Sequence, residues 1–133
     1  MADDWNAEAT WQRWVTQHEH WMREHGRESP RPEQTIHAIA EITMRRTEDG
    51  GRSSPIRSGY RGQFHYDGYD WDAHYIFDTE DWIQPGEAAE AIIQFISPWV
   101  HQGSLHPGKE FLIREGLHTV GQGWITWVAE ELH

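Results

Sequence analysis

The chain has 133 residues and no cysteine, which suits a single domain with its own core and excludes disulfides and thiolate metal sites. Its formal net charge of −11 at pH 7 weighs against non-specific nucleic-acid binding, because neutralising phosphates requires a cationic surface. No apolar run is long enough to span a membrane and the N-terminus lacks a signal-peptide pattern, so we expect a cytoplasmic protein.

Residues 4–25 are predicted to form an amphipathic α-helix, which assigns residues 1–28 to an N-terminal helical element. Aromatic side chains recur there at three- and four-residue spacing, and this gathers Trp11, Trp14 and Trp21 on one face. We expect the aromatic face to pack on the outside of this chain's own β domain, since such helices gain their stability from tertiary packing. The alternatives are a dimer contact or a docking helix for another protein.

A Pro-containing linker, residues 29–35, separates this helix from a β domain over residues 36–133. Apolar residues alternate from Ile36 to Met44, and Asp67-Gly68 is a turn signal between two aromatic-rich segments. Short strands joined by turns predict a mainly β domain, either an antiparallel barrel or a sandwich. Six strands are predicted: residues 36–46, 60–66, 71–77, 88–97, 110–115 and 119–130.

Charge is distributed unevenly along the β domain. Residues 67–90 contain eight carboxylates and no Lys or Arg, whereas residues 45–61 contain five arginines against Glu48 and Asp49. One end of the molecule is therefore expected to be locally basic within an acidic envelope, unless these charges are simply solvated. Nine tryptophans either fill the core of the domain or contribute to a surface that binds a partner.

Several sequence blocks in the β domain resemble the C-terminal β-barrel domain (domain 3) of elongation factor Tu, in that family's order and near its spacing. The resemblance runs from about residue 36 to residue 128 and implies a closed six-stranded antiparallel β-barrel. The blocks are Gly50-Gly51-Arg52, Gly59-Tyr60-Arg61-Gly62-Gln63-Phe64, Pro85-Gly86, Ser97-Pro98, and Ile113-Arg114-Glu115-Gly116 followed by Thr119-Val120-Gly121 and Gly123.

In that family, domain 3 grips the T-arm of aminoacyl-tRNA, packs against the GTPase domain and contacts the exchange factor. The resemblance implies that the RNA-side positions here are Arg61 and the turn Glu115-Gly116. Three departures weaken that face: Gly62 replaces a proline, Leu117-His118 removes a fixed positive charge, and Glu110 replaces a basic residue. Alternatively, Arg61 and Arg114 are held by carboxylates inside the domain.

Catalysis is not expected. The phosphate-binding loop of P-loop GTPases is absent, because Gly108-Lys109-Glu110 lacks both the preceding loop and the following hydroxyl. Ten histidines raise the question of a metal, but His18 and His20 would point in different directions from a helix, and the acids around His74 lack the glycine of a calcium loop. We therefore expect no enzyme activity, no metal and no cofactor.

The sequence favours a non-catalytic binding module that engages a protein of, or near, the translation machinery. The alternative is binding of tRNA or structured RNA through a face formed by Arg52, Arg61 and Arg114. Neither the identity of the partner nor the choice between monomer and dimer follows from the sequence. The candidate contact residues are Arg52, Arg57, Arg61, Arg114, Glu115 and Gly116 on the β domain, and Trp11, Trp14 and Trp21 on the helix.

Overall fold

The structure is a computed structural model that describes residues 36–77 and 79–133. Seven antiparallel strands form one sheet in the order β3-β2-β6-β7-β1-β5-β4. In the described residues the helical segments are short 3₁₀ turns, η2 (Thr47–Asp49), η3 (Pro98–His101) and η4 (Glu130–Leu132). The strands are β1 (Ala38–Met44), β2 (Gln63–Tyr66), β3 (Tyr69–Trp71), β4 (Ala73–Phe77), β5 (Ala88–Phe95), β6 (Glu110–Glu115) and β7 (His118–Val128).

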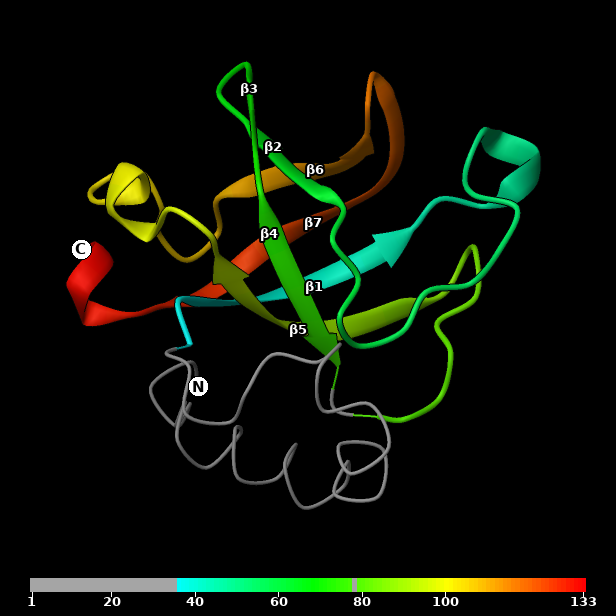
Figure 1. Ribbon diagram of the computed structural model, residues 1–133, viewed down its shortest axis with the longest axis horizontal. Helices are drawn as coiled ribbons and strands as arrows, with labels where there is room; N and C mark the ends of the chain where they lie inside the picture. Colours follow the sequence, from blue (N-terminus) through cyan, green and yellow to red (C-terminus); the bar gives the residue numbers. More distant parts are fainter. Residues whose placement is uncertain (1–35, 78) are drawn as a thin grey trace.

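The sheet is strongly curled (Figure 1). Its two edge strands, β3 and β4, follow each other directly in the chain. β3 pairs with β2, β4 pairs with β5, and Asp72 alone separates β3 from β4. An isolated bridge between Tyr60 and Tyr75 joins the segment before β2 to β4. The result is a curled half-barrel, in which the strand ladder is interrupted between its two edges.

Expectation and structure agree on a mainly β, antiparallel domain and differ on closure and strand number. The predicted strand 71–77 is divided at Asp72, where the chain changes partner. Trp71 is the last residue of β3, which pairs with β2, and residues 73–77 form β4, which pairs with β5. The sheet therefore has seven strands and two edges, rather than six strands in a closed ladder. The predicted helix at residues 4–25 and the linker at residues 29–35 lie outside the described residues.

The predicted turn at Asp67-Gly68 is confirmed. Both residues have positive φ, 51° at Asp67 and 85° at Gly68, as a two-residue hairpin turn of type I′ requires. The turn sets the register of the hairpin, in which Tyr66 pairs with Tyr69 and Phe64 with Trp71. Glycine at the second position adopts this backbone without steric cost.

One hydrophobic core fills the inside of the curl. Phe64 is central to it, because its ring stacks on Phe111 with centroids 4.1 Å apart and meets Phe95 edge to face at 5.1 Å. The predicted alternation in residues 36–46 is confirmed, since the inward positions of β1 are all buried. These are Ala38, Ala40, Ile42 and Met44.

A row of buried isoleucines lies on the opposite face of the same sheet. Ile39, Ile92 and Ile76 are cross-strand neighbours on β1, β5 and β4, and each is at most 2% exposed. Side chains alternate along a strand, so these three point away from the core that contains their neighbours Ala40 and Ile93. The outward face of β1, β5 and β4 therefore carries a buried apolar row at Ile39, Ile92 and Ile76.

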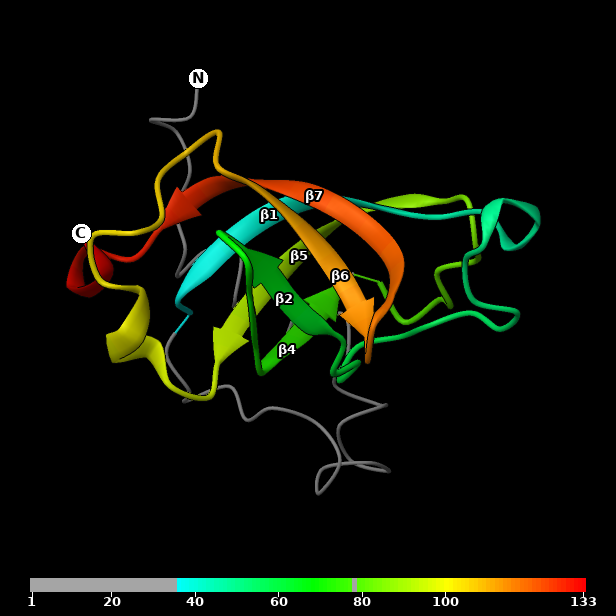
Figure 2. The same ribbon diagram turned by 90° about the horizontal axis from the view of Figure 1, so that it is seen from above.

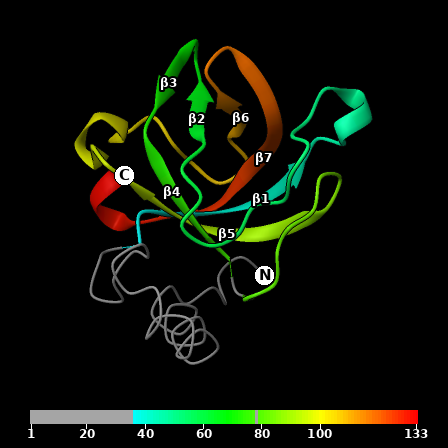
Figure 3. The same ribbon diagram turned by 45° about the vertical axis from the view of Figure 1, so that its right-hand side comes forward.

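The two ends of the half-barrel carry different elements (Figure 2, Figure 3). η3 and η4 lie together at one end, and η2 with the loop that follows it lies at the other. None of the helical segments in the described part of the chain has the length and apolar character of a membrane span.

η3 places His101 in the aromatic core, where the side chain is 1% exposed and its ring centroid lies 4.0 Å from that of Phe95. Burial, and then the nearby His37, lower the pKa of His101 to about 4. The imidazole is therefore neutral near pH 7. The Tyr66 hydroxyl and His101 Nδ1 share a hydrogen bond across 2.6 Å, which pairs this buried ring nitrogen without a charge.

Candidate functional site

The loop between η2 and β2, residues 50–62, carries three of the predicted contact arginines, and its backbone is tightly constrained. The Gly51 amide donates to the Arg46 carbonyl at 2.9 Å. Gly51 passes so close to the preceding chain that an added Cβ would lie 2.1 Å from the Arg45 carbonyl oxygen. Glycine is therefore required at position 51, immediately before Arg52 leaves the backbone.

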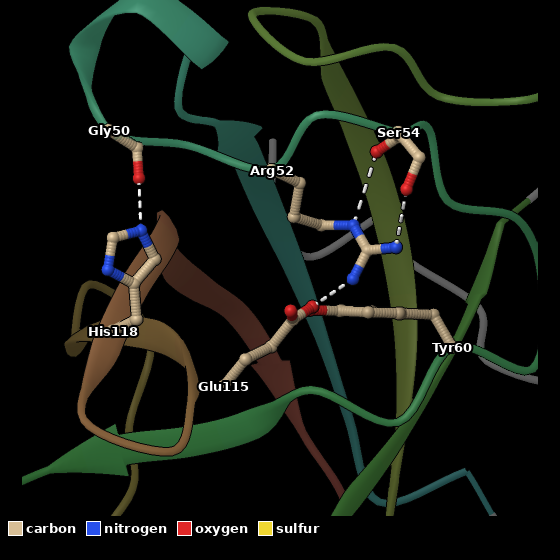
Figure 4. Close-up of polar contacts among 6 residues, drawn as sticks. All are labelled: Gly50, Arg52, Ser54, Tyr60, Glu115 and His118. Atoms are coloured by element: carbon tan, nitrogen blue, oxygen red, sulfur yellow. Dashed lines mark hydrogen bonds and ion pairs between the residues drawn. The ribbon is translucent and has the colours of Figure 1, made fainter.

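Arg52 is held by side chains from three parts of the chain (Figure 4). Its Nη1 donates to Glu115 Oε2 at the end of β6, and the Tyr60 hydroxyl donates to the same carboxylate oxygen across 2.5 Å. The other guanidinium nitrogens donate to Ser54, Nε to the carbonyl at 3.2 Å and Nη2 to Oγ at 3.0 Å. Two candidate contact residues, Arg52 and Glu115, therefore form an ion pair with each other.

Tyr60 stays a neutral hydrogen-bond donor within this cluster. Burial, and then its hydrogen bond to Glu115, raise the pKa of the Tyr60 phenol, while the charge of Arg52 opposes part of that shift. The guanidinium of Arg52 also lies 5.4 Å from the Tyr60 ring centroid, within cation–π range. His118 Nε2 donates to the Gly50 carbonyl, so that the start of β7 is tied to the same loop (Figure 4).

A shallow groove of about 280 Å³ runs along this loop. Its walls include Arg52, Arg57, Tyr60 and Trp82. The guanidinium of Arg57 lies over the Trp82 ring, 4.7 Å from its centroid, and Trp82 is 48% exposed. Arginines beside accessible aromatic rings are the side chains most enriched where proteins bind other proteins. We call Arg52, Arg57, Arg61, Tyr60 and Trp82 the arginine rim.

Arg114 is held inside the domain, on the sheet. Its Nη1 lies 3.5 Å from Asp70 Oδ2 and 3.1 Å from His65 Nδ1, and the side chain is 17% exposed. His65 Nδ1 also lies 2.8 Å from Asp70 Oδ1, to which it donates when protonated at that nitrogen. Arg114 therefore matches the interpretation in which a carboxylate of this domain holds the arginine.

Arg61 differs from the other candidate arginines. Its side chain is exposed, and among the described residues it has no hydrogen bond or ion pair. It acts at a distance: after burial, the positive charge of Arg61 is the next cause that lowers the pKa of His74. Gly116 is exposed in the β6–β7 turn beside Leu117, which is 92% exposed.

The structure thus brings Arg52, Arg57 and Glu115 to one end of the domain and holds Arg114 separately, by Asp70. Trp11, Trp14 and Trp21 lie outside the described residues. The sequence places Tyr60 in the predicted strand 60–66 and does not indicate that its hydroxyl binds Glu115. The sequence patterns also do not single out Trp82. The available signal for Trp82 was a large aromatic residue in an acidic segment between two predicted strands.

Acidic and histidine side chains do not converge on a metal site in the described part of the chain. Residues 36–77 and 79–133 contain no group of three or more potential ligands placed to hold a metal ion. His65 and Asp70 lie within hydrogen-bond distance of each other, and Asp70 also pairs with Arg114. The geometry of the rim supports non-covalent binding through charge-assisted hydrogen bonds and stacking.

The curled antiparallel half-barrel places the protein in the class of small, mainly β, barrel-like domains. The family model described as the elongation factor Tu C-terminal domain matches residues 29–129. This is more than half of the chain, and the protein belongs to that family. The resemblance predicted from the sequence is confirmed, and the family consists of non-catalytic β-barrel domains with a translation-related binding role.

Proposed function

We propose that this protein is a non-catalytic, cytoplasmic binding module that engages a protein of the translation machinery through the arginine rim. The observation that carries the proposal is the groove beside residues 50–62, where the cation–π pair Arg57–Trp82 lies next to the Arg52–Tyr60–Glu115 cluster. Such pairs offer a partner flat apolar area and several fixed donors at once. Family membership supports a partner in translation.

A protein partner fits this rim better than RNA does. Glu115 neutralises Arg52 and Asp70 neutralises Arg114, so two of the three arginines of the proposed RNA face are already paired. The whole chain carries a net charge of −11, which repels phosphate at long range. Arg61 and Arg57 then recognise carboxylates or carbonyls on a protein surface.

The test is direct binding to purified translation components by isothermal titration calorimetry, beginning with the GTPase domain of elongation factor Tu and its exchange factor. We expect saturable binding of one of them. Arg61→Ala abolishes it without changing thermal stability, and Arg57→Ala weakens it. Arg46→Ala is the matched control, because Arg46 is exposed and pairs with Glu48 and Asp49 at the same end of the domain. Equal losses in all three variants would contradict the proposal.

The second candidate function is binding of tRNA or structured RNA. Arg61 supports it, because this cation is exposed and has no ion-pair partner among the described residues. A filter-binding titration with aminoacylated and deacylated tRNA at low and near-physiological salt separates the two functions. Tight binding that falls steeply with salt and is lost in Arg52→Ala or Arg61→Ala would favour RNA over protein.

We further propose that residues 1–28 form a helix whose face of Trp11, Trp14 and Trp21 packs on the row of Ile39, Ile76 and Ile92. The support is that this row is apolar and buried and lies on the outer face of the sheet, with Ile39 in the first strand of the β domain. Replacing the three tryptophans by Ala in the full chain should then shift the methyl NMR signals of the three isoleucines, but not that of Ile113 in the core. Unchanged isoleucine signals, with a changed sedimentation coefficient, would indicate a dimer contact instead.

A further inference from the structure

A second groove, on the outer face of β2, β6 and β7, has a charge opposite to that of the arginine rim. Its volume is about 450 Å³, within the range of sites that bind ligands or short peptide segments. Leu112 and Trp124 line it and are 36% and 49% exposed, so the groove presents apolar surface to solvent. No lysine or arginine is among its lining residues, whereas Asp67 and Glu110 are.

Strand register places Trp124 between two carboxylates. On β6 its cross-strand partner is Glu110, and on β1 it is Glu41. Glu41 in turn lies opposite Glu90 on β5, so one row across four strands reads Glu90, Glu41, Trp124, Glu110. Directly opposed side chains of an antiparallel pair have Cβ atoms about 5 Å apart. One bound cation over Trp124 can therefore contact the carboxylates on both sides of it.

The lysine that precedes Glu110 in the chain does not neutralise it. Lys109, the only lysine, precedes Glu110 but binds Asp67 Oδ1 at 2.8 Å and lies over the Tyr66 ring. Among the described residues, neither Glu41 nor Glu110 has an ion-pair partner.

We propose that this groove binds an arginine-bearing, extended peptide segment of a partner protein, with a guanidinium stacked on Trp124 between Glu41 and Glu110. An indole face attracts a cation through its quadrupole, and guanidinium prefers flat stacking while its edges donate to carboxylates. An apolar residue beside the arginine packs on Leu112. The chain's net charge of −11 attracts a basic segment and repels nucleic acid. This site is independent of the arginine rim and of its proposed function.

Fluorescence anisotropy of the full chain with a short labelled peptide of alternating Arg and Leu tests the site. The control peptide carries Gln at every Arg. We expect saturable binding of the Arg peptide alone, weakening with salt. Trp124→Ala lowers the affinity about tenfold, the loss of one desolvated cation–π contact. Glu110→Gln, on an exposed side chain, lowers it about threefold.

Trp99→Ala is the matched control, because Trp99 is 71% exposed on η3 and is not part of the groove. Its affinity should equal that of the unmodified protein. Equal binding of the Gln peptide, an equal loss in Trp99→Ala, or no binding of the Arg peptide overturns the proposal. A concentration-dependent dimer that Trp124→Ala abolishes would instead assign the groove to a second copy of this chain, and this too overturns it.

Discussion

The two ends of the half-barrel each contain a tyrosine hydroxyl that is hydrogen-bonded to a neighbouring side chain, and the two hydrogen bonds differ in kind. At the rim, Tyr60 donates to the carboxylate of Glu115, which also binds Arg52. At the opposite end, Tyr66 shares a hydrogen bond with the neutral ring of His101 inside the aromatic core. The first is a charged, partly exposed cluster, and the second is buried and uncharged.

The difference indicates which end is available for recognition. The side chains of Arg52 and Glu115 are 24% and 38% exposed, so their pairing costs little dehydration and can be extended by a partner's polar groups. His101 is 1% exposed, and a charge there would lie among aromatic rings with no compensating partner. We infer that the η3–η4 end stabilises the domain and that the rim end contacts partners.

The largest effect is expected from the backbone of the rim. Gly51→Ala should lower the free energy of unfolding by about 3 kcal/mol, because its Cβ would meet the carbonyl oxygens of Arg45 and Arg46, which are backbone atoms and cannot turn away. Gly50→Ala is the matched control: its φ is 94°, but the space around it is open, and it should cost about 1 kcal/mol. Urea denaturation measures both, and equal losses would show that the loop can relax.

At the other end, stability should depend on pH through His101. Its folded-state pKa of about 4 lies below its ordinary value of 6.5, so between these values the unfolded chain binds a proton that the folded protein excludes. The contribution of His101 to the free energy of unfolding is therefore constant above pH 6.5. As pH decreases from 6.5 toward 4, protonation of the unfolded chain lowers the free energy of unfolding by up to about 1.4 kcal/mol per pH unit.

Denaturation midpoints measured between pH 4 and 7 test this dependence. In His101→Gln the slope should become shallower, although it persists in part, because burial also lowers the pKa values of His37 and His74. His106→Gln, on an exposed side chain, is the control and should leave the slope unchanged. A slope identical to that of the unmodified protein in His101→Gln would rule out the buried histidine as its source.

The rim ion pair should contribute a smaller, measurable amount. A double-mutant cycle of Arg52→Ala and Glu115→Ala should give a coupling energy of about 1 kcal/mol, since both side chains are partly exposed and solvent screens their attraction. Tyr60→Phe removes the second donor to Glu115 and keeps the ring beneath Arg52. A coupling energy of zero would contradict this expectation and would show that the ion pair does not contribute to the stability of the domain.

The smallest effect on stability is expected at Arg61. Arg61→Ala should change the free energy of unfolding by no more than about 0.5 kcal/mol, because the side chain is exposed and has no ion-pair partner among the described residues. Together with lost binding to a translation component, this result would assign Arg61 to recognition. A stability loss as large as that of Arg52→Ala would assign it to the scaffold.

Local sequence patterns determined most of the strand framework. Alternation in residues 36–46 identified the inward face of β1, the Asp67-Gly68 pair identified a turn, and the spaced motif blocks identified the family. These properties depend on backbone geometry and side-chain period within one short segment, which are written directly in the order of residues. The unequal distribution of charge between residues 45–61 and 67–90 was also visible.

Only the tertiary structure decided how residues far apart in the chain meet. Arg52 and Glu115 are separated by 63 positions, and nothing local to either predicts that they form an ion pair with each other while Arg114 binds Asp70. Strand register likewise placed Trp124 between Glu41 and Glu110, and the change of partner at Asp72 left the sheet open. Long-range pairing depends on how the whole sheet curls, because the curl decides which side chains share a face, and no local pattern contains that information.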